Sequence, residues 1–251
     1  MRTFLRPTIL LLISIFTFSC QFSSEKEKLE ASNFFIRGNQ KWKEKEYREA
    51  LKWYNEAIEK DPKLSDAYFN RGLVYLTIEK PEEALSDFEQ AFKLDPSFSA
   101  ALFKKVEALQ TLNKLDEAQK EGKLLVKNFP DSSANHRLIG DIFLQQKQLS
   151  NSLSEYQIAL KIDPNNLEAK INEGVVYQEM GQLDLAEKSF QSVLSSGKYT
   201  DLIYNNLGYL EIQRKQYERA KKWIDKALYL SPNNELYLRN LKRIEDESGL
   251  K

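Results

Sequence analysis

Small residues recur along the chain at intervals of 34 residues, and large apolar residues form a second column sixteen positions further on. The first column reads Gly38, Gly72, Val106, Gly140, Gly174 and Gly208. The second column reads Tyr54, Phe88, Gly122, Tyr156, Phe190 and Ile224. Alanine is frequent four positions before and three positions after the large apolar column, and Asp-Pro then follows in three units. Six units therefore cover residues 31–234 without an insertion or deletion.

Each unit has the apolar spacing of two helices that pack against each other. In the second unit Ala84, Phe88 and Ala91 lie four and three residues apart, which places them on one face of a helix. Proline near the end of most units stops the helix, because the residue before a proline disfavours helical geometry. Pro81 instead opens a helix, where its missing N–H is harmless. One unit cannot bury its apolar face alone, so we expect the helices to stack into a solenoid.

These columns resemble the tetratricopeptide repeat, whose period is also 34 residues. The resemblance rests on the pattern Gly72-x-x-Tyr75 … Ala84-x-x-x-Phe88-x-x-Ala91 … Pro96. It implies an all-α fold, a right-handed α-solenoid of six helix-turn-helix repeats. The repeats would occupy residues 31–64, 65–98, 99–132, 133–166, 167–200 and 201–234. Residues 235–251 would form a capping helix, with Leu238, Leu241 and Ile244 on its apolar side.

Two repeats depart from the pattern. The third has Gly122 in the large apolar column, which predicts a void where the other repeats pack an aromatic or aliphatic side chain. A glycine within a helix also costs about 1 kcal/mol relative to alanine. The fifth ends in Ser196-Gly197-Lys198 in place of Asp-Pro, so Gly197 is expected to cap its helix. We expect these two places to be the softest or the most altered in curvature.

Residues 1–19 have the features of a secretory signal peptide, namely two arginines, an apolar run over residues 9–18 and a small residue before Cys20. The run is shorter than the roughly 20 residues that a membrane span needs. Residues 17–20, Thr-Phe-Ser-Cys, resemble a lipobox. That resemblance implies a lipid on Cys20, residues 20–30 as a polar tether, and attachment in the bacterial cell envelope. Gln21, which is not the aspartate of inner-membrane retention, favours the outer membrane. Ordinary cleavage that leaves a free thiol is the alternative.

Composition and motifs argue against an enzyme. Lysine plus arginine equals aspartate plus glutamate at 37 each, which gives no electrostatic reason to expect nucleic acid as a partner. The sequence shows no glycine-rich phosphate loop and no cluster with metal-ligand spacing, so we expect no cofactor, metal or small-molecule substrate. The single histidine, His136, occupies a position that is aromatic in other repeats, where packing is the simpler role.

The resemblance also implies a binding surface. In the family, positions 2, 5, 9 and 12 of the first helices line a concave groove, where residue 31 is position 1 of the first repeat. The residues that we expect to bind a peptide there are Phe35, Asn39, Trp42, Phe69, Leu73, Leu76, Phe103, Arg137, Ile171 and Tyr209. The alternative is that neighbouring side chains partly bury them. An apolar groove with polar flanks suits an extended or helical peptide segment.

Two further features leave alternatives open. Some family members clamp a terminal carboxylate, and Asn39, Asn70 and Lys104 match part of that set, but Phe35 and Ala100 stand where lysines are needed. Trp53 and Trp223 share one position of the second helix, where packing explains them at least as well as a convex binding site.

The sequence therefore predicts a membrane-anchored scaffold for protein–protein interaction in the bacterial envelope. A periplasmic holdase for unfolded exported chains is one alternative. The other is an assembly factor for a secretion or type IV pilus system, similar to the pilotin lipoproteins, which are also lipidated stacks of six such repeats.

Overall fold

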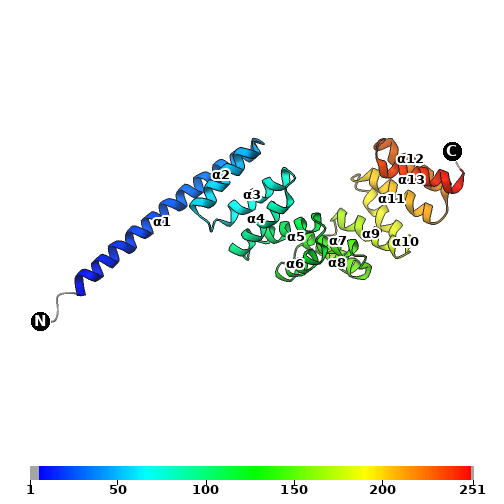
Figure 1. Ribbon diagram of the computed structural model, residues 1–251. Coiled ribbons are helices and arrows are strands. Elements are labelled where there is room, and N and C mark those ends of the chain that lie inside the picture. Colours follow the sequence, from blue (N-terminus) through cyan, green and yellow to red (C-terminus); the bar gives the residue numbers. More distant parts are fainter. Residues whose placement is uncertain (1–5, 250–251) are drawn as a thin grey trace. The chain divides into compact units, whose positions relative to one another are not determined.

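The structure, a computed structural model, describes the backbone of residues 6–249 and the side chains of residues 25–249. Within that range the chain forms thirteen α-helices and no β-strand, which confirms the all-α prediction (Figure 1). The lipidation predicted at Cys20 and the side chains of the predicted signal peptide lie outside the described residues, as do residues 250–251 of the capping segment.

Each predicted repeat contributes two consecutive helices. The first helices are α1 (Arg6–Lys43), α3 (Ser65–Thr77), α5 (Ser99–Thr111), α7 (Ser133–Gln145), α9 (Leu167–Glu179) and α11 (Thr200–Gln213). The second helices are α2 (Tyr47–Lys60), α4 (Pro81–Leu94), α6 (Leu115–Asn128), α8 (Leu149–Ile162), α10 (Leu183–Leu194) and α12 (Tyr217–Leu230). The capping helix is α13 (Glu235–Ser248).

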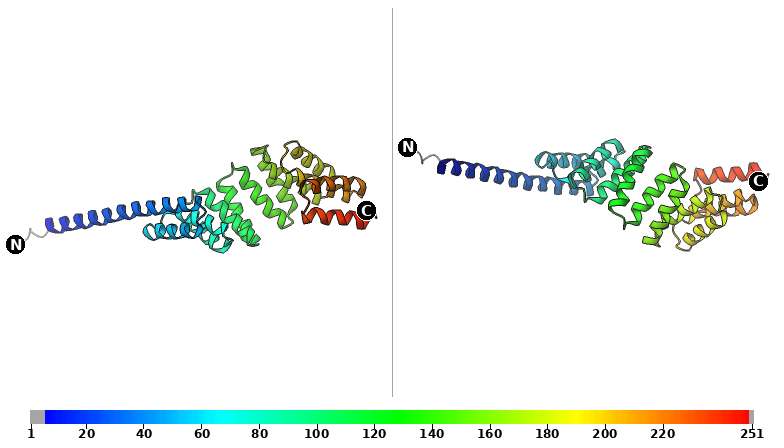
Figure 2. Two further views of the ribbon diagram at one scale, coloured as in Figure 1. Left: turned by 90° about the horizontal axis from the view of Figure 1, so that it is seen from above. Right: turned by 90° about the horizontal axis from the view of Figure 1, so that it is seen from below.

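The chain divides into two compact units, and the boundary falls between Glu121 and Gly122 inside α6. The N-terminal unit contains α1 to α5, and the C-terminal unit contains α7 to α13. In each unit consecutive helices pack side by side as hairpins (Figures 1 and 2). The boundary lies in the third repeat, next to the glycine at which the sequence departs from the pattern.

The glycine column lets the two helices of a repeat cross closely. A Cβ added at Gly72 would lie 2.7 Å from Phe88 Cε1, which is closer than any packed structure tolerates. Gly122 is different, because an added Cβ would meet Ile139 Cδ1 of the next repeat at 3.3 Å. The predicted void at Gly122 is therefore wrong: the side chain of Ile139 fills the space.

The turn between the two helices of each repeat contains one residue in the left-handed region. Five of these residues are not glycine and have φ between 56° and 62°, namely Lys45, Glu79, Asn113, Lys147 and Lys215. The sixth, Gly181, has φ 75°. These residues are spaced by 34, yet only one of them is glycine, so residue type alone does not predict this column.

The structure confirms the proline signals at helix ends. Pro81 occupies the first turn of α4. Asp61 ends α2 in an extended conformation before Pro62, and its Oδ1 accepts the N–H of Lys63 at 3.0 Å. Gly197 has φ 70° and donates its N–H to the Leu194 carbonyl at 3.1 Å, but the C-cap residue of α10 is Ser195, so the cap lies two residues before the expected one.

The capping helix α13 packs on α12 through two of the three predicted residues, Leu241 and Ile244. Leu238 is 45% exposed, so its place in the apolar stripe is wrong. Tyr237, which was not predicted to face the repeats, is buried in its place. Asn240 is also buried, and its Nδ2 donates to Asn205 Oδ1 of α11 at 2.7 Å. Tyr237 also donates its hydroxyl to Asp201 Oδ2 at 3.2 Å, so the helix docks through hydrogen bonds as well as through apolar packing.

The N-terminal helix α1 continues through the segment expected to be a polar tether. Its backbone is helical from Arg6 to Lys43, and Glu25 to Leu29 are exposed. Ala31 is the first buried residue of the repeat region. In the part of the chain that the structure describes, no helix combines the length and the apolar character needed to cross a bilayer.

Candidate functional site

The expected peptide-binding residues of the N-terminal unit are half-buried. Phe35 packs at 6.0 Å from the Tyr54 ring, and Phe69 packs at 5.7 Å from Phe88 and 4.7 Å from Phe98, measured between ring centroids. Trp42, Leu73 and Leu76 also pack against the core of this unit, each with part of the side chain accessible. Phe103 is half-buried beside Lys104, whose Nζ lies 5.8 Å from its ring centroid. This surface, called the first-helix face below, is thus a partly buried apolar strip.

Asn39 supports this face by joining two repeats. Its Oδ1 accepts the Tyr54 hydroxyl at 2.7 Å within the first repeat and Asn70 Nδ2 at 2.8 Å from the second. Burial raises the pKa of Tyr54 to about 12, so the hydroxyl remains a donor at neutral pH. Both bonds lie within the chain, so the Asn39 side chain joins α1, α2 and α3. Its amide oxygen is therefore occupied in the absence of a ligand.

The C-terminal unit repeats this arrangement with a carboxylate. Asp141 Oδ1 accepts the Tyr156 hydroxyl at 2.7 Å and Asn172 Nδ2 at 2.7 Å. Burial raises the pKa of Asp141, and hydrogen bonds from Tyr156 and Asn172 and the charge of Arg137 oppose that rise. Burial, together with the nearby charge of Asp141, raises the pKa of Tyr156 well above its usual range.

Arg137 neutralises the charge of this network. Its Nη1 donates to Asp141 Oδ2 at 2.5 Å, and its Nε lies 3.2 Å from Glu168 Oε2. The Glu168 carboxylate also accepts the Tyr199 hydroxyl at 3.1 Å. Arg137 was expected to face a ligand, and it lies on the expected face, but its guanidinium already has two carboxylate partners.

Two other expected residues differ in accessibility. Ile171 is only 5% exposed and belongs to the core around Phe190 and Leu207, so its assignment as a ligand contact is wrong. Tyr209 is half-buried, and the Arg243 guanidinium of α13 lies 5.5 Å from its ring centroid. Of the two, Tyr209 alone offers a partly open ring to a ligand.

A second set of contacts, not foreseen from the sequence, joins positions 7 and 23 within single repeats. Arg71 forms two bonds to Asp87, from Nε to Oδ2 at 2.8 Å and from Nη2 to Oδ1 at 2.6 Å. Burial raises the pKa of Asp87, although Arg71 opposes that rise. Glu173 accepts the Ser189 hydroxyl at 3.0 Å in the same relation. The signal in the sequence was the complementary chemistry of residues sixteen apart.

Internal packing accounts for the tryptophans and the histidine. Trp53 stacks on Phe34 at 5.6 Å and 22°, and Trp223 lies 5.5 Å from the Tyr204 ring. His136 is buried with Nδ1 at 2.7 Å from Glu155 Oε2 and Nε2 at 2.9 Å from the Pro130 carbonyl oxygen. Its packing role is therefore supported. No group of three or more histidine, cysteine, aspartate or glutamate side chains among the described residues could hold a metal ion.

Models of the tetratricopeptide repeat match most of the repeat region. A model described as a TPR repeat matches residues 38–78 and 140–181. Two models described as a tetratricopeptide repeat match residues 65–98 and residues 167–196 and 202–234. None of these ranges includes residues 99–132, the repeat that departs furthest from the pattern.

Known proteins and structures are similar to the chain at low identity. The DnaJ protein P58IPK homolog of Arabidopsis thaliana is 29% identical over 205 residues, which are 73% of this chain and 42% of that protein. The chain spans less than half the length of the curated relatives it matches.

Solved structures share the fold. The Pseudomonas aeruginosa pilF structure has a TM-score of 0.72 at 15% identity and covers 89% of this chain and 100% of that chain. The structure of YrrB, described as a TPR protein with an unusual peptide-binding site, has a TM-score of 0.59 at 22% identity and covers 75% of this chain and 97% of that one. The repeat columns, the stacked helix pairs and these matches together show that the chain belongs to the tetratricopeptide repeat family.

Proposed function

We propose that this repeat protein is a scaffold that binds a partner polypeptide on the first-helix face and is held at a bacterial envelope membrane by a lipid on Cys20. The observation that carries the binding proposal is the half-buried strip formed by Phe69, Leu73 and Leu76. Apolar side chains that are fixed by a core yet partly open to solvent are suited to anchor a peptide, because they lose little freedom on binding. The fold similarity to YrrB supports a peptide as the ligand class.

A charged substitution on this strip tests the binding site. Leu76→Arg in the full-length chain should abolish capture of a partner from an envelope extract, because an arginine there would be desolvated by the bound peptide. Ser86→Arg places the same side chain at an exposed position of α4 and serves as the control. Equal capture by the two variants would refute the first-helix face as the binding site.

Phenylalanine substitutions are less suitable as a test. Phe69→Ala removes ring contacts with Phe88 and Phe98, so loss of capture would be mixed with loss of stability. Removing a buried aromatic side chain costs about 3–5 kcal/mol, and a half-buried one costs part of that. Leu76→Arg leaves the ring contacts of Phe69 in place, so it separates loss of binding from loss of those contacts.

The lipid anchor has its own test. The wild-type protein should incorporate a radioactive fatty acid in bacterial cells, and Cys20→Ala should not. Label on Cys20→Ala, or no label on the wild type, would remove the anchor from the proposal. Fractionation of the two membranes then tests the preference for the outer membrane.

An assembly factor similar to the pilotin lipoproteins is the second candidate. The observation that favours it is the architecture of six complete repeats followed by a capping helix. A dedicated assembly factor should capture one or two defined partners, whereas the holdase alternative should suppress aggregation of many unrelated unfolded chains. Comparing both readouts for the same preparation distinguishes these functions.

A further inference from the structure

The junction between the fifth and sixth repeats is charged where an earlier junction is apolar. Between the second and third repeats, position 21 of one repeat and positions 11 and 14 of the next are leucine, as the printed sequence shows. These residues are Leu85, Leu109 and Leu112. The corresponding residues between the fifth and sixth repeats are Glu187, Glu211 and Arg214. Charged side chains at packing positions are costly, so they indicate a role other than packing.

Arg214 holds three carboxylates at this junction. Its Nη1 donates to Glu187 Oε2 at 2.7 Å and to Glu211 Oε1 at 2.8 Å, and its Nη2 donates to Asp184 Oδ1 at 2.6 Å. Among the described residues, Arg214 is the one cation within ion-pair distance of these three acids. The cluster therefore carries more negative charge than Arg214 neutralises.

Glu211 is the deepest of the three acids and is incompletely bonded. Its side chain is 8% exposed, and its Oε2 is a buried atom that has no hydrogen-bond partner among the described residues. The second to fifth repeats place Tyr75, Leu109, Phe143 and Tyr177 at this position, and the first repeat places Lys41 there. Its carboxylate is turned toward Arg214, because Oε1 accepts from that guanidinium. A buried, half-satisfied carboxylate is unfavourable unless another donor completes it.

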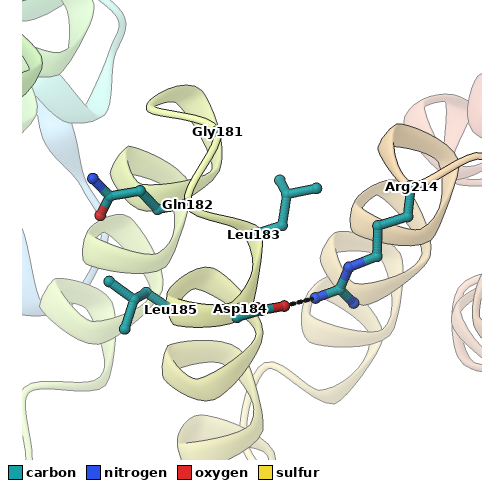
Figure 3. Close-up of a pocket in the computed structure, with 6 residues that line it drawn as sticks. All are labelled: Gly181, Gln182, Leu183, Asp184, Leu185 and Arg214. Atoms are coloured by element: carbon teal, nitrogen blue, oxygen red, sulfur yellow. Dashed lines mark hydrogen bonds and ion pairs between the residues drawn. The ribbon is translucent and has the colours of Figure 1, made fainter.

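A cavity opens directly on this cluster. It has a volume of about 460 Å³ and is lined by Gly181, Gln182, Leu183, Asp184, Leu185 and Arg214 (Figure 3). The Asp184 side chain, at the start of α10, is 98% exposed although it is bonded to Arg214, the C-cap residue of α11. Leu185 is 45% exposed, whereas most other repeats carry a charged residue at that position. The cavity thus combines accessible carboxylate oxygens with apolar wall.

We propose that this cavity binds a basic side chain, lysine or arginine, of the partner polypeptide. This inference depends on the proposed function in one respect, namely that the ligand is a polypeptide. An alkyl chain that ends in a cation fits a cavity lined by Leu183, Leu185 and Asp184. Glu187 does not line the cavity, but it bonds to Arg214, which does. Arginine matches carboxylates best, because its planar fork can bond two oxygens at once.

Exchange of partners within the cluster explains how the cation is accommodated. Arg214 now divides its two terminal nitrogens among three acids. When the incoming cation takes Asp184 and Glu187, Arg214 can turn both nitrogens to Glu211 and complete Oε2. No carboxylate then lacks a donor, and two cations instead of one balance the three carboxylates, so the excess negative charge of the cluster is halved.

Titration of the full-length chain with tri-arginine tests this site without any knowledge of the natural partner. In NMR spectra the backbone amides of residues 181–185 and the Arg214 Nε–H signal should shift in a saturable way. Asp184→Asn with Glu187→Gln should weaken tri-arginine binding roughly tenfold or more. Glu82→Gln, which changes the position in the second repeat that corresponds to Asp184, should alter it less than about twofold.

A second variant shows whether a loss of tri-arginine binding could come from loss of folding. Replacing Glu187, Glu211 and Arg214 together by leucine copies the apolar junction of the second and third repeats, and it should keep the helical fold while abolishing the saturable shifts. Persistence of the shifts in that variant, equal weakening by Glu82→Gln, or tri-glutamate acting like tri-arginine would overturn the proposal. Spermidine binding at least as tightly as tri-arginine would overturn the polypeptide as the source of the cation. Failure of partner capture by Leu76→Arg tests only the proposed function, so the two results remain separable.

Discussion

The N-terminal and C-terminal units use the same three positions to join neighbouring repeats, but with different charge. In the N-terminal unit Asn39 accepts from Tyr54 and Asn70, whereas in the C-terminal unit Asp141 accepts from Tyr156 and Asn172. The geometry is shared, since each acceptor lies 2.7–2.8 Å from both donors. A repeat position therefore fixes where a hydrogen bond forms, and the residue type fixes whether it carries charge.

The difference also changes position 5 of the same repeat. Beside Asn39 that position holds Phe35, which packs on Tyr54, and beside Asp141 it holds Arg137, which supplies the counter-charge. The neutral version leaves an apolar side chain on the first-helix face. The charged version places an ion pair at the equivalent position of the C-terminal unit, so the two units offer different surfaces to a partner.

Removing the acceptor of the charged network should have the largest effect. Asp141→Ala leaves the Tyr156 hydroxyl, Asn172 and Arg137 without their shared partner, and we expect a loss of about 2–4 kcal/mol in the free energy of unfolding. Urea unfolding followed by circular dichroism measures it. A loss below that of the neutral counterpart would contradict the greater importance of the charged network.

Loss of the neutral network should lower the free energy of unfolding by less than loss of the charged one. Asn39→Ala leaves two neutral donors unpaired and should cost about 1–2 kcal/mol, because no ion pair is lost. The same urea experiment applies, with Gln40→Ala at an exposed neighbouring position as the control. If Asn39→Ala has no more effect than the control, the bonds to Tyr54 and Asn70 do not contribute to stability.

The two networks should differ in their response to pH. Burial raises the pKa of Asp141 in the folded state, so the folded chain binds more protons than the unfolded chain in the window above the unfolded value of about 3.9. Stability contributed by Asp141 should therefore fall as pH rises through that window. The difference in unfolding midpoint between wild type and Asp141→Asn, measured across that range, isolates this effect. Asn39→Ala should show no such pH-dependent difference from wild type.

Changes at the turns should be small and equal in the two units. Lys45 and Lys147 have φ of 62° and 58°, a conformation that glycine adopts without steric cost. Lys45→Gly and Lys147→Gly should each change the free energy of unfolding by less than about 1 kcal/mol, in the stabilising direction, because relief of strain slightly exceeds the added entropy of the unfolded chain. Unequal effects on thermal unfolding would show that the turns depend on the networks beside them.

The helices and their order could be predicted from the sequence because each depends on short-range signals that recur. Apolar spacing and Pro81 both act within a few residues of their own position. The repeat columns multiplied these signals by six, and the structure confirms every expected helix of the repeat region.

Features set by contact between repeats could not be predicted in this way. Ile171 is buried and the space beside Gly122 is filled because of side chains from other helices, and Leu238 points outward because α13 docks through Tyr237 and Asn240. The left-handed turn residues were missed because most of them are lysine or glutamate. Neither residue type prefers a left-handed conformation, so neither predicts one. The polar networks were missed because a single asparagine or aspartate does not indicate its donors.

The unbroken backbone of α1 has a further consequence if the chain is attached through a lipid on Cys20, as we propose. A flexible linker would limit only the distance between the attachment point and the repeats. A continuous helix also fixes the direction that the first repeat faces. Each residue of an α-helix turns the chain by about 100° and advances it by about 1.5 Å. Inserting two residues between the attachment point and Ala31 would therefore swing the first-helix face of the N-terminal unit by about half a turn, whereas inserting a whole number of turns would lift it and leave its heading nearly unchanged.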